Sequence, residues 1–306
     1  MKNNQNSQVI IANVNKGMVY MLLAVLILPF TDALGKYLST SLSPTQIVFL
    51  RYFLQFIFLL PFFIFSKKRI ETFKIVYLYL GVCVSISIIL LFWGLKYLPL
   101  ANSTALFFAE PLFLTILSIV FLNEKITRNH LIALFLGLIG TLIIIRPNFS
   151  LYGIASFLPI GSAFFYALYL IFIRISTDLG SKISVQFYNS IVASIFIFIF
   201  LIVGQIYDID VMMFKSIDSS LYILIFCLGF LAVIVQLLIS SAFYHAKASS
   251  LASFQYLEII SATFLGWLIF NNTPDELTIL GAIIVICSGI YLARHENKSS
   301  KAISLN

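Results

Sequence analysis

Charged residues are scarce in this 306-residue chain, where Asp, Glu, Lys and Arg together make up only 10% of the sequence. A soluble globular domain carries about 25% charged residues, so this chain cannot cover itself with a polar surface. Hydrophobic residues make up 61% of it, and the mean hydropathy is +1.04. The shortage of charge excludes a soluble protein and indicates an integral membrane protein.

Cysteines and sequence motifs for cofactors are also few. The three cysteines lie inside apolar runs without a CxxC pair, so neither a disulfide framework nor a zinc site is indicated. The sequence contains no P-loop and no HExxH motif, which argues against direct use of ATP and against a zincin-type site. The net charge of +7 comes from cations scattered through short segments, so nucleic acid is not expected as a partner. We expect no cofactor, no metal and no catalytic residue.

Long apolar runs are what the chain has in quantity. Ten of them are bounded by charged or turn residues, and each is long enough to cross a hydrocarbon core about 30 Å thick. The runs are continuous rather than alternating, so they predict helices and not the strands of a barrel. The predicted spans are 17–38, 45–65, 75–95, 100–122, 130–146, 152–173, 184–204, 220–243, 248–270 and 277–293.

The distribution of Lys and Arg predicts the orientation. If the N-terminus is cytoplasmic, 14 of the 19 Lys and Arg residues fall in cytoplasmic segments and three fall outside. Such an excess follows the positive-inside rule, so both termini are predicted to be cytoplasmic and the loop 205–219 external. The N-terminal segment lacks the pattern of a removable signal peptide, so the first span is expected to remain. We expect a multi-pass protein of the inner (cytoplasmic) membrane, with the lipid bilayer as its surroundings.

Two glutamates near the middle of apolar runs suggest an internal repeat. Glu110 and Glu258 are 148 residues apart, and a carboxylate in hydrocarbon is costly enough to be rare without a functional reason. The same interval relates Asn123 to Asn271 and Arg146 to Arg294. Internal repeats of this kind are common in secondary transporters.

The early part of each half matches at a second interval, of 138 residues. It relates Lys36 to Arg174, Ser43 to Ser181 and Phe49 to Phe187. Each half contains five predicted spans, an odd number, so the second copy is expected to enter the membrane inverted. The expected organisation is a cytoplasmic N-tail 1–16, repeats 17–146 and 152–294, and a cytoplasmic C-tail 295–306.

The segments 93–146 and 241–294 contain further motifs. The first reads W-G-L-K-Y-L-P-L-A-N-S-T-A-L-F-F-A-E-P-L-F, then F-L-N-E-K, then G-L-I-G. This pattern resembles the EamA domain of the drug/metabolite transporter superfamily, with an E-P pair inside an apolar helix and an acid just after that helix. The second copy departs from it, since Ile259 follows its glutamate and Asn272 stands where the first copy has Glu124.

The resemblance covers 17–293 in two copies and implies a ten-helix carrier of small organic solutes that works by alternating access. It does not imply which solute. Residues 28–39 and 48–53 are similar to the branch of the family that contains riboflavin and S-adenosylmethionine carriers.

Glu110 and Glu258 are the leading candidates for a binding site. Each lies about ten residues into its span, which at about 1.5 Å per residue is near the middle of the bilayer. A carboxylate at that depth can bind a cationic group or carry a proton. The alternative is a protonated glutamic acid that hydrogen-bonds a neighbouring helix.

Asp32, Lys36 and Arg51 form a second candidate group. Asp32 and Lys36 are four residues apart, so they share one face of the first helix, and Arg51 lies near the start of the second. They are expected either to form a polar outer vestibule for a charged or zwitterionic solute or to neutralise one another and fix helix packing.

Aromatic and amide side chains complete the candidate site. Rings can stack on a planar or cationic substrate, although with 31 Phe and 15 Tyr any one ring can equally be core or lipid-facing. The candidates are Trp93, Tyr188, Gln255 and Tyr256, with Tyr97 and Tyr166 also considered.

A secondary transporter of a small organic metabolite is the function favoured by these features. The expected substrate is cationic or zwitterionic, with an amino-acid-, nucleoside- or flavin-like character. The alternatives are a membrane-embedded structural or assembly protein and an intramembrane enzyme. Proton coupling and a homodimer are both compatible with the sequence, and the direction of transport is open.

Overall fold

Helices make up the architecture of this computed structural model, which describes residues 2–65, 72–98, 100–146, 153–270 and 275–305. Within those ranges, nine helical segments are long and apolar enough to cross a membrane. The predicted all-α integral membrane fold is therefore confirmed, while the count of ten spans stays a prediction.

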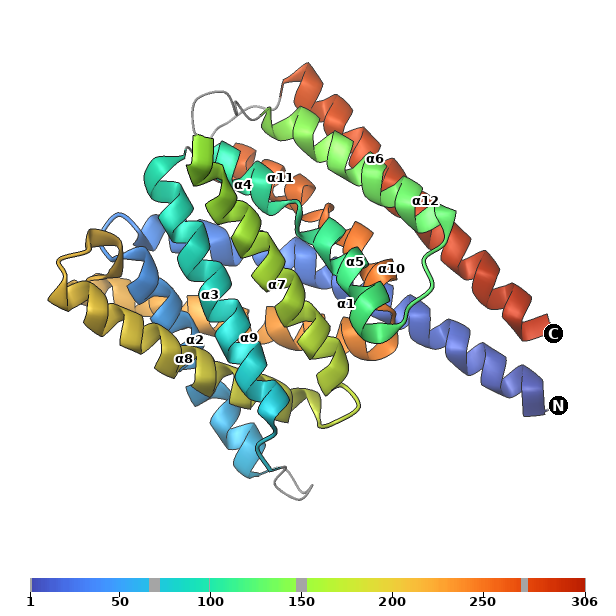
Figure 1. The fold of residues 1–306 in the computed structure, drawn as a ribbon, viewed down its shortest axis with the longest axis horizontal. Coiled ribbons are helices and arrows are strands. Elements are labelled where there is room, and N and C mark those ends of the chain that lie inside the picture. Colours follow the sequence, from blue (N-terminus) through green and yellow to red (C-terminus); the bar gives the residue numbers. More distant parts are fainter. Residues whose placement is uncertain (1, 66–71, 99, 147–152, 271–274, 306) are drawn as a thin grey trace.

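The chain divides into two sets of six helices (Figure 1). The first set is α1 (Lys2–Leu38), α2 (Pro44–Ile64), α3 (Ile75–Tyr97), α4 (Leu100–Phe107), α5 (Glu110–Leu122) and α6 (Arg128–Ile145). The second is α7 (Phe157–Ser176), α8 (Lys182–Ile206), α9 (Tyr222–His245), α10 (Ala248–Gln255), α11 (Glu258–Phe270) and α12 (Glu276–Leu305). Short 3-10 helices lie at Gly153–Ser156, Asp210–Met212 and Ser219–Leu221.

Two of the predicted spans are broken rather than continuous. The span 100–122 is divided into α4 and α5, and the span 248–270 into α10 and α11. In the first copy Pro111 explains the break, because proline has no N–H to donate to the carbonyl four residues earlier. In the second copy Ile259 occupies the equivalent position, so proline cannot be the cause there.

The repeat predicted from the sequence reappears in the helix boundaries. The starts of α4, α5 and α6 each lie 148 residues before those of α10, α11 and α12. Ser43 and Ser181, related by the 138-residue interval, are both N-caps whose hydroxyls accept a backbone N–H three residues on. The same local chemistry therefore begins α2 and α8.

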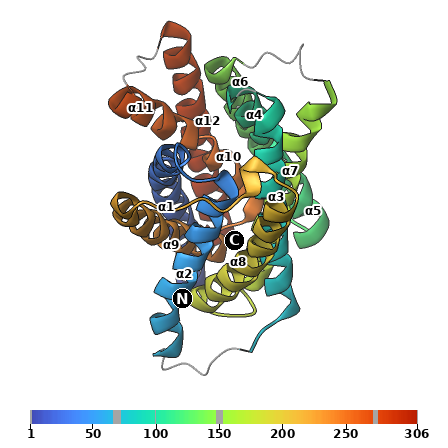
Figure 2. The ribbon, with the colours of Figure 1, turned by 90° about the vertical axis from the view of Figure 1, so that its left-hand side faces the viewer.

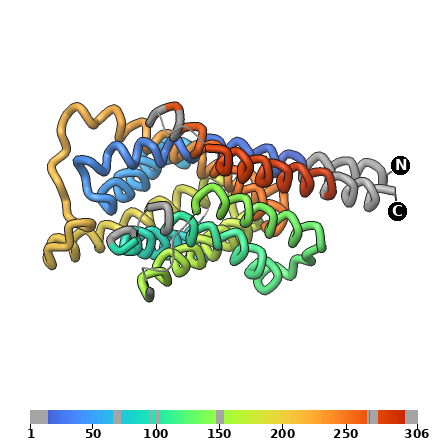
Figure 3. The backbone as a smooth tube through the Cα atoms, turned by 90° about the horizontal axis from the view of Figure 1, so that it is seen from above, coloured from blue at the N-terminus to red at the C-terminus, as the bar shows by residue number. Residues whose placement is uncertain are grey.

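The two repeats cross the bundle in opposite directions, and α1 begins at the same end at which α12 ends (Figure 1). We call this the inner end, because the sequence predicts it to be cytoplasmic, and the opposite one the outer end. Figure 3 shows α1 and α12 running alongside each other, and the two helices are in contact.

Helix packing follows the repeat symmetry. The α1–α9 contact has its equivalent in α3–α7, and α2–α9 in α3–α8. The contacts of α2 with α8 and of α6 with α12 each join equivalent helices of the two repeats. Figure 2 shows α9, α2, α8 and α3 in succession across one side of the bundle.

The α6–α12 contact depends on two small residues. A Cβ atom added to Gly140 would lie 2.8 Å from the backbone oxygen of Gly281, and one added to Gly281 would lie 2.7 Å from the oxygen of Gly140. Without side chains at these positions, the two backbones can approach closely.

An ion pair joins the same two helices at the outer end. The guanidinium of Arg146, which follows α6, lies 2.7 Å from the carboxylate of Asp275, which precedes α12. Asp275 also accepts hydrogen bonds from the backbone N–H and hydroxyl of Thr278. Together these bonds hold the pKa of Asp275 well below its ordinary value of 3.8.

The hydrophobic core draws on helices of both repeats, while other apolar side chains point away from it. Ile116, Ile195 and Phe226 are each more than half exposed. Acyl chains cover such side chains in a bilayer, so an apolar exterior is expected of a membrane-spanning bundle.

Candidate functional site

Each candidate glutamate is the first residue after a helix break. Glu110 begins α5 and Glu258 begins α11. The unpaired N–H groups and the dipole of a helix N-terminus favour negative charge. Discontinuous helices of this kind commonly form the binding sites of secondary transporters. Glu110 is 2% exposed, whereas Glu258 is partly exposed.

The two breaks lie against each other. Gln255, the last residue of α10, donates a hydrogen bond from Nε2 to Oε1 of Glu110 at 3.4 Å. The hydroxyl of the fully buried Tyr256 donates to the carbonyl oxygen of Phe108 at 3.3 Å. Gly137 leaves room for the Tyr256 ring, because a Cβ there would lie 2.4 Å from Cδ2 of the tyrosine.

Asp32 and Arg51 are close enough to Glu258 to interact with it electrostatically. Glu258 interacts with Asp32, Glu110 and Arg51, and Asp32 interacts with Arg51. The structure thus brings together residues from α1, α2, α5 and α11 that are far apart in the sequence. We define the central cluster as Asp32, Arg51, Glu110, Tyr166, Gln255 and Glu258.

Accessibility differs across the central cluster. The side chain of Asp32 is exposed, although protein atoms occupy much of the volume around it. Arg51, Tyr166 and Glu258 are partly exposed, whereas Glu110 and Gln255 are buried.

Arg51 has unused hydrogen-bonding capacity. Its Nε is buried and has no hydrogen-bond partner among the described residues. Its guanidinium carbon lies 6.0 Å from the centroid of the Tyr52 ring. A buried donor without a partner is costly, which makes Arg51 suited to receive an acceptor from a ligand.

Tyr166 supplies an aromatic surface beside the carboxylates. It interacts electrostatically with Glu110 and Glu258, and its ring centroid lies 5.6 Å from that of Phe107 and 5.5 Å from that of Tyr169. Its ring therefore lies beside the two candidate glutamates.

The other aromatic candidates have different surroundings. Tyr188 stacks on Tyr77 at 5.2 Å between ring centroids and also packs against Phe63 and Phe73. Trp93 is 41% exposed near the outer end of α3. Tyr256 lies in the contact between the two helix breaks. Among the charged candidates, Lys36 has an exposed side chain on α1.

A buried polar network lies beside the central cluster and was not predicted as a group from the sequence. Gln186 of α8 contacts Gln55 of α2 at 3.3 Å and donates to the hydroxyl of Ser240 of α9 at 2.7 Å. Tyr169 of α7 donates to Gln236 of α9, also at 2.7 Å. Amides isolated in apolar helices are the sequence signal for such interhelical bonds.

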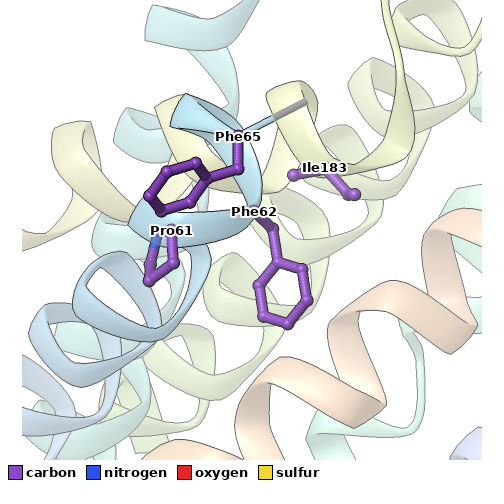
Figure 4. A pocket seen from close by; sticks show the side chains of 4 residues that line it. All are labelled: Pro61, Phe62, Phe65 and Ile183. Carbon is purple, nitrogen blue, oxygen red and sulfur yellow. The ribbon is translucent and has the colours of Figure 1, made fainter. Parts of the chain in front are cut away.

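A pocket on the bundle surface is apolar and lies away from the central cluster. Pro61, Phe62 and Phe65 at the inner end of α2 line it together with Ile183 of α8 (Figure 4). It offers no polar side chain to orient a solute, so we do not consider it a candidate transport site.

Metal ligands are not grouped in the part of the chain that the structure describes. Within those ranges no three His, Cys, Asp or Glu side chains are placed to hold a metal ion.

The sequence matches the EamA-like transporter family twice, over residues 15–146 and 153–294. These matches confirm the two-repeat organisation and the family resemblance predicted from the sequence.

Full-length relatives carry the names of metabolite carriers. The chain is 28% identical over 285 residues to an S-adenosylmethionine uptake transporter of Rickettsia prowazekii, covering 92% of this chain and 94% of that one. It is 27% identical over 295 residues to a riboflavin transporter of Vibrio cholerae, with 94% and 95% covered. It is also 26% identical over 218 residues to a pseudopaline exporter of Pseudomonas aeruginosa, with 70% and 73% covered.

The fold is also seen in solved structures. One crystal structure superimposes with a TM-score of 0.79 at 14% sequence identity, covering 92% of this chain and 98% of the other. At this identity the likeness concerns the fold alone. The two family matches and the metabolite carriers among its relatives show that the chain belongs to the EamA-like transporter family and is a membrane transporter rather than an enzyme.

Proposed function

We propose that this protein is a secondary transporter of a small organic metabolite with a cationic or zwitterionic part, which it binds at the central cluster and moves by alternating access. The observation that carries the proposal is the meeting of three carboxyl groups and one guanidinium where the breaks of two inverted repeats touch.

The charge balance of the central cluster favours a cation. Asp32, Glu110 and Glu258 outnumber Arg51, so a fully ionised cluster carries an excess of negative charge inside the bundle. Desolvated carboxylates are tolerated best when a cation or hydrogen-bond donor meets them. A substrate ammonium or sulfonium group would offset that excess, and a proton could do so when the substrate is absent.

Arg51 favours a substrate that also carries an acceptor. Its buried Nε has no hydrogen-bond partner in the part of the chain that the structure describes, and a carboxylate or a carbonyl oxygen of the substrate would supply one. This arrangement suits a zwitterion better than a simple cation.

The flat part of a substrate can lie against Tyr166. A ring beside two carboxylates allows stacking on an aromatic group and a cation–π contact with a charged one. The relatives that bear the names of S-adenosylmethionine, riboflavin and pseudopaline are named for organic metabolites rather than inorganic ions, which supports the same substrate class.

A structural or assembly role accounts less well for these features. A structural protein needs close helix packing, which the glycines and the glutamine network supply. Carboxylates inside the membrane are costly and would add nothing to that role. The family assignment also sets aside the intramembrane enzyme considered from the sequence.

The proposed orientation has the inner end in the cytoplasm and the protein in the inner membrane. It is supported by the excess of Lys and Arg in the segments at that end.

Ligand-induced stabilisation of the purified full-length protein tests the proposed substrate class. We expect S-adenosylmethionine, an amino acid or riboflavin to raise the melting temperature, because a ligand at about 100 times its Kd adds about 2.7 kcal/mol to folded-state stability. Arg51→Gln should weaken the effect of zwitterions more than that of simple organic cations.

Asp178→Asn is the matched control, since Asp178 is an exposed acid between α7 and α8. It should leave every ligand effect unchanged. Stabilisation by glucose or sulfate alone, with no response to any cationic or zwitterionic metabolite, would contradict the proposed class.

A further inference from the structure

The loop after α5 holds the first turn of α10 in the other repeat. The carboxylate of Glu124 accepts hydrogen bonds from the backbone N–H groups of Ala248 and Ser249, both at 3.0 Å, and from the Ser249 hydroxyl at 2.6 Å. His130 Nε2 lies 3.2 Å from the hydroxyl of Ser250. Three successive residues of α10 are thus held by the first repeat at the inner end, and we call these contacts the inner latch.

Local structure fixes the first-repeat side of the inner latch. Asn123 adopts a left-handed backbone conformation with φ of 52°, and the N–H of Glu124 donates to the carbonyl of Ser118. His130 Nδ1 lies 2.7 Å from the hydroxyl of Thr127, the N-cap of α6. The two residues that contact α10 are therefore tied to α5 and α6.

The opposite end of α10 reaches the central cluster. This helix spans only Ala248–Gln255, and its last residue donates the hydrogen bond to Glu110. The break that follows separates it from α11. α10 therefore connects the inner latch, at its first turn, with the central cluster, at its last residue.

The two repeats differ at this point although their helix boundaries match. All six residues at 251–256 are buried, whereas only three of the six equivalent residues at 103–108 are. The half-helix at the inner end is thus more enclosed than the half-helix at the outer end. The sequence equivalent of Glu124 is Asn272, a neutral amide that lies outside the described residues.

We propose that Glu124 is a positioning residue of the transport cycle: the inner latch keeps the central cluster closed toward the inner end and must release to open it there. Charge-assisted hydrogen bonds are about twice as strong as neutral ones, so the carboxylate that only the first repeat has biases the resting carrier toward the inner-closed conformation. This inference rests on the alternating-access part of the proposed function but not on the identity of the substrate.

Cysteine accessibility tests the inner latch without a substrate. Ser253 is 1% exposed on α10, and Ser253→Cys serves as a reporter once Cys83, Cys227 and Cys287 are replaced by alanine. A membrane-impermeant maleimide is applied to right-side-out and to inverted vesicles, each carrying the full-length chain. In the vesicles that expose the inner end, we expect Glu124→Gln to be labelled about ten times faster than the parent. In the other vesicles the two proteins should be labelled at the same rate.

Two control variants distinguish release of the inner latch from a general loss of stability of the protein. Glu124→Asp keeps the charge and should label close to the parent rate, and Asp178→Asn removes an exposed charge at the same end and should not change labelling. Equal rates for Glu124→Gln and the parent, or an equal rise for Glu124→Gln and Asp178→Asn, would overturn the proposal.

A milder variant covers the case in which Glu124→Gln does not fold. Ser249→Ala removes only the hydroxyl donor to Glu124, so it should raise labelling in the same vesicles by a smaller factor. An unchanged rate for this variant would count against the inner latch. If labelling rises as expected but no tested metabolite binds, the inner latch stands and only the proposed substrate class fails.

Discussion

Single charged side chains in this protein have two different environments. Arg51, Asp32 and Glu258 interact with one another inside the bundle. Arg146 and Asp275 pair at the outer end with exposed side chains. In the central cluster the carboxyl groups outnumber the guanidinium, whereas Arg146 and Asp275 neutralise each other.

The outer ion pair predicts a pH-dependent effect on stability. The lowered pKa of Asp275 means that its contribution is present above its ordinary value of 3.8 and is lost as the pH falls below that value. Asp275→Asn keeps the capping oxygen for Thr278 but removes the charge. We expect a small loss of melting temperature at pH 7 that narrows as the solution is acidified below pH 3.8.

Salt gives the control for this prediction. The exposed pair should be screened, so the difference between the parent and Asp275→Asn should also shrink at about 1 M salt. A difference that does not change with salt or with pH would show that the aspartate acts through packing and not through its charge.

At the scale of helices, the breaks in the fourth and ninth predicted spans matter most. The first could be anticipated, since Pro111 cannot take part in the hydrogen bond that would continue α4. The second could not, because Ile259 is compatible with a continuous helix and no proline marks the position. Both runs are apolar throughout, so their hydropathy alone predicts two unbroken spans.

The candidate site, like the helix breaks, could be predicted only in part from the sequence. The cost of burying a carboxylate pointed to Glu110 and Glu258, whereas Arg51 was expected with Asp32 and Lys36 in an outer vestibule. The structure places Arg51 within electrostatic reach of Glu258. Aromatic residues carry no comparable cost, so composition could not distinguish Tyr166 beside the carboxylates from Tyr188 in its aromatic stack. The direction in which a ring points depends on helix rotation, which a single sequence does not determine.

Helix packing at the repeat interface predicts one strongly destabilising substitution. Gly140→Leu would place its Cβ 2.8 Å from the backbone oxygen of Gly281, so α6 and α12 would have to separate. Overpacking of this kind costs about 1–3 kcal/mol, and thermal unfolding in detergent should show a lower melting temperature.

Gly35 provides the matched comparison, since nothing lies within 4 Å of a Cβ built there. Gly35→Ala should leave the melting temperature nearly unchanged. If Gly140→Leu is as stable as the parent, the α6–α12 contact is less close than the structure indicates.

At the scale of the whole molecule, two inverted repeats place their equivalent helix breaks against each other. The inner end is the one with the more enclosed half-helix, and its latch is made by a carboxylate that the other repeat lacks in sequence. The helix boundaries of the two repeats match, but the acid Glu124 of the first repeat is replaced by the neutral Asn272 in the second. That difference allows a symmetric architecture to favour one conformation at rest.

Uptake by proteoliposomes is the most direct test of the central claim, that the carboxylates at the helix breaks bind the transported metabolite. Radiolabelled S-adenosylmethionine and riboflavin serve as probes, with glucose and sulfate as comparisons, for the parent and for Glu258→Gln. We predict time-dependent uptake of at least one of the two metabolites and a loss of about tenfold or more in Glu258→Gln at an unchanged melting temperature, since the amide keeps the volume and removes the charge. Uptake by Glu258→Gln at the parent rate, or transport of sulfate alone, would contradict the account.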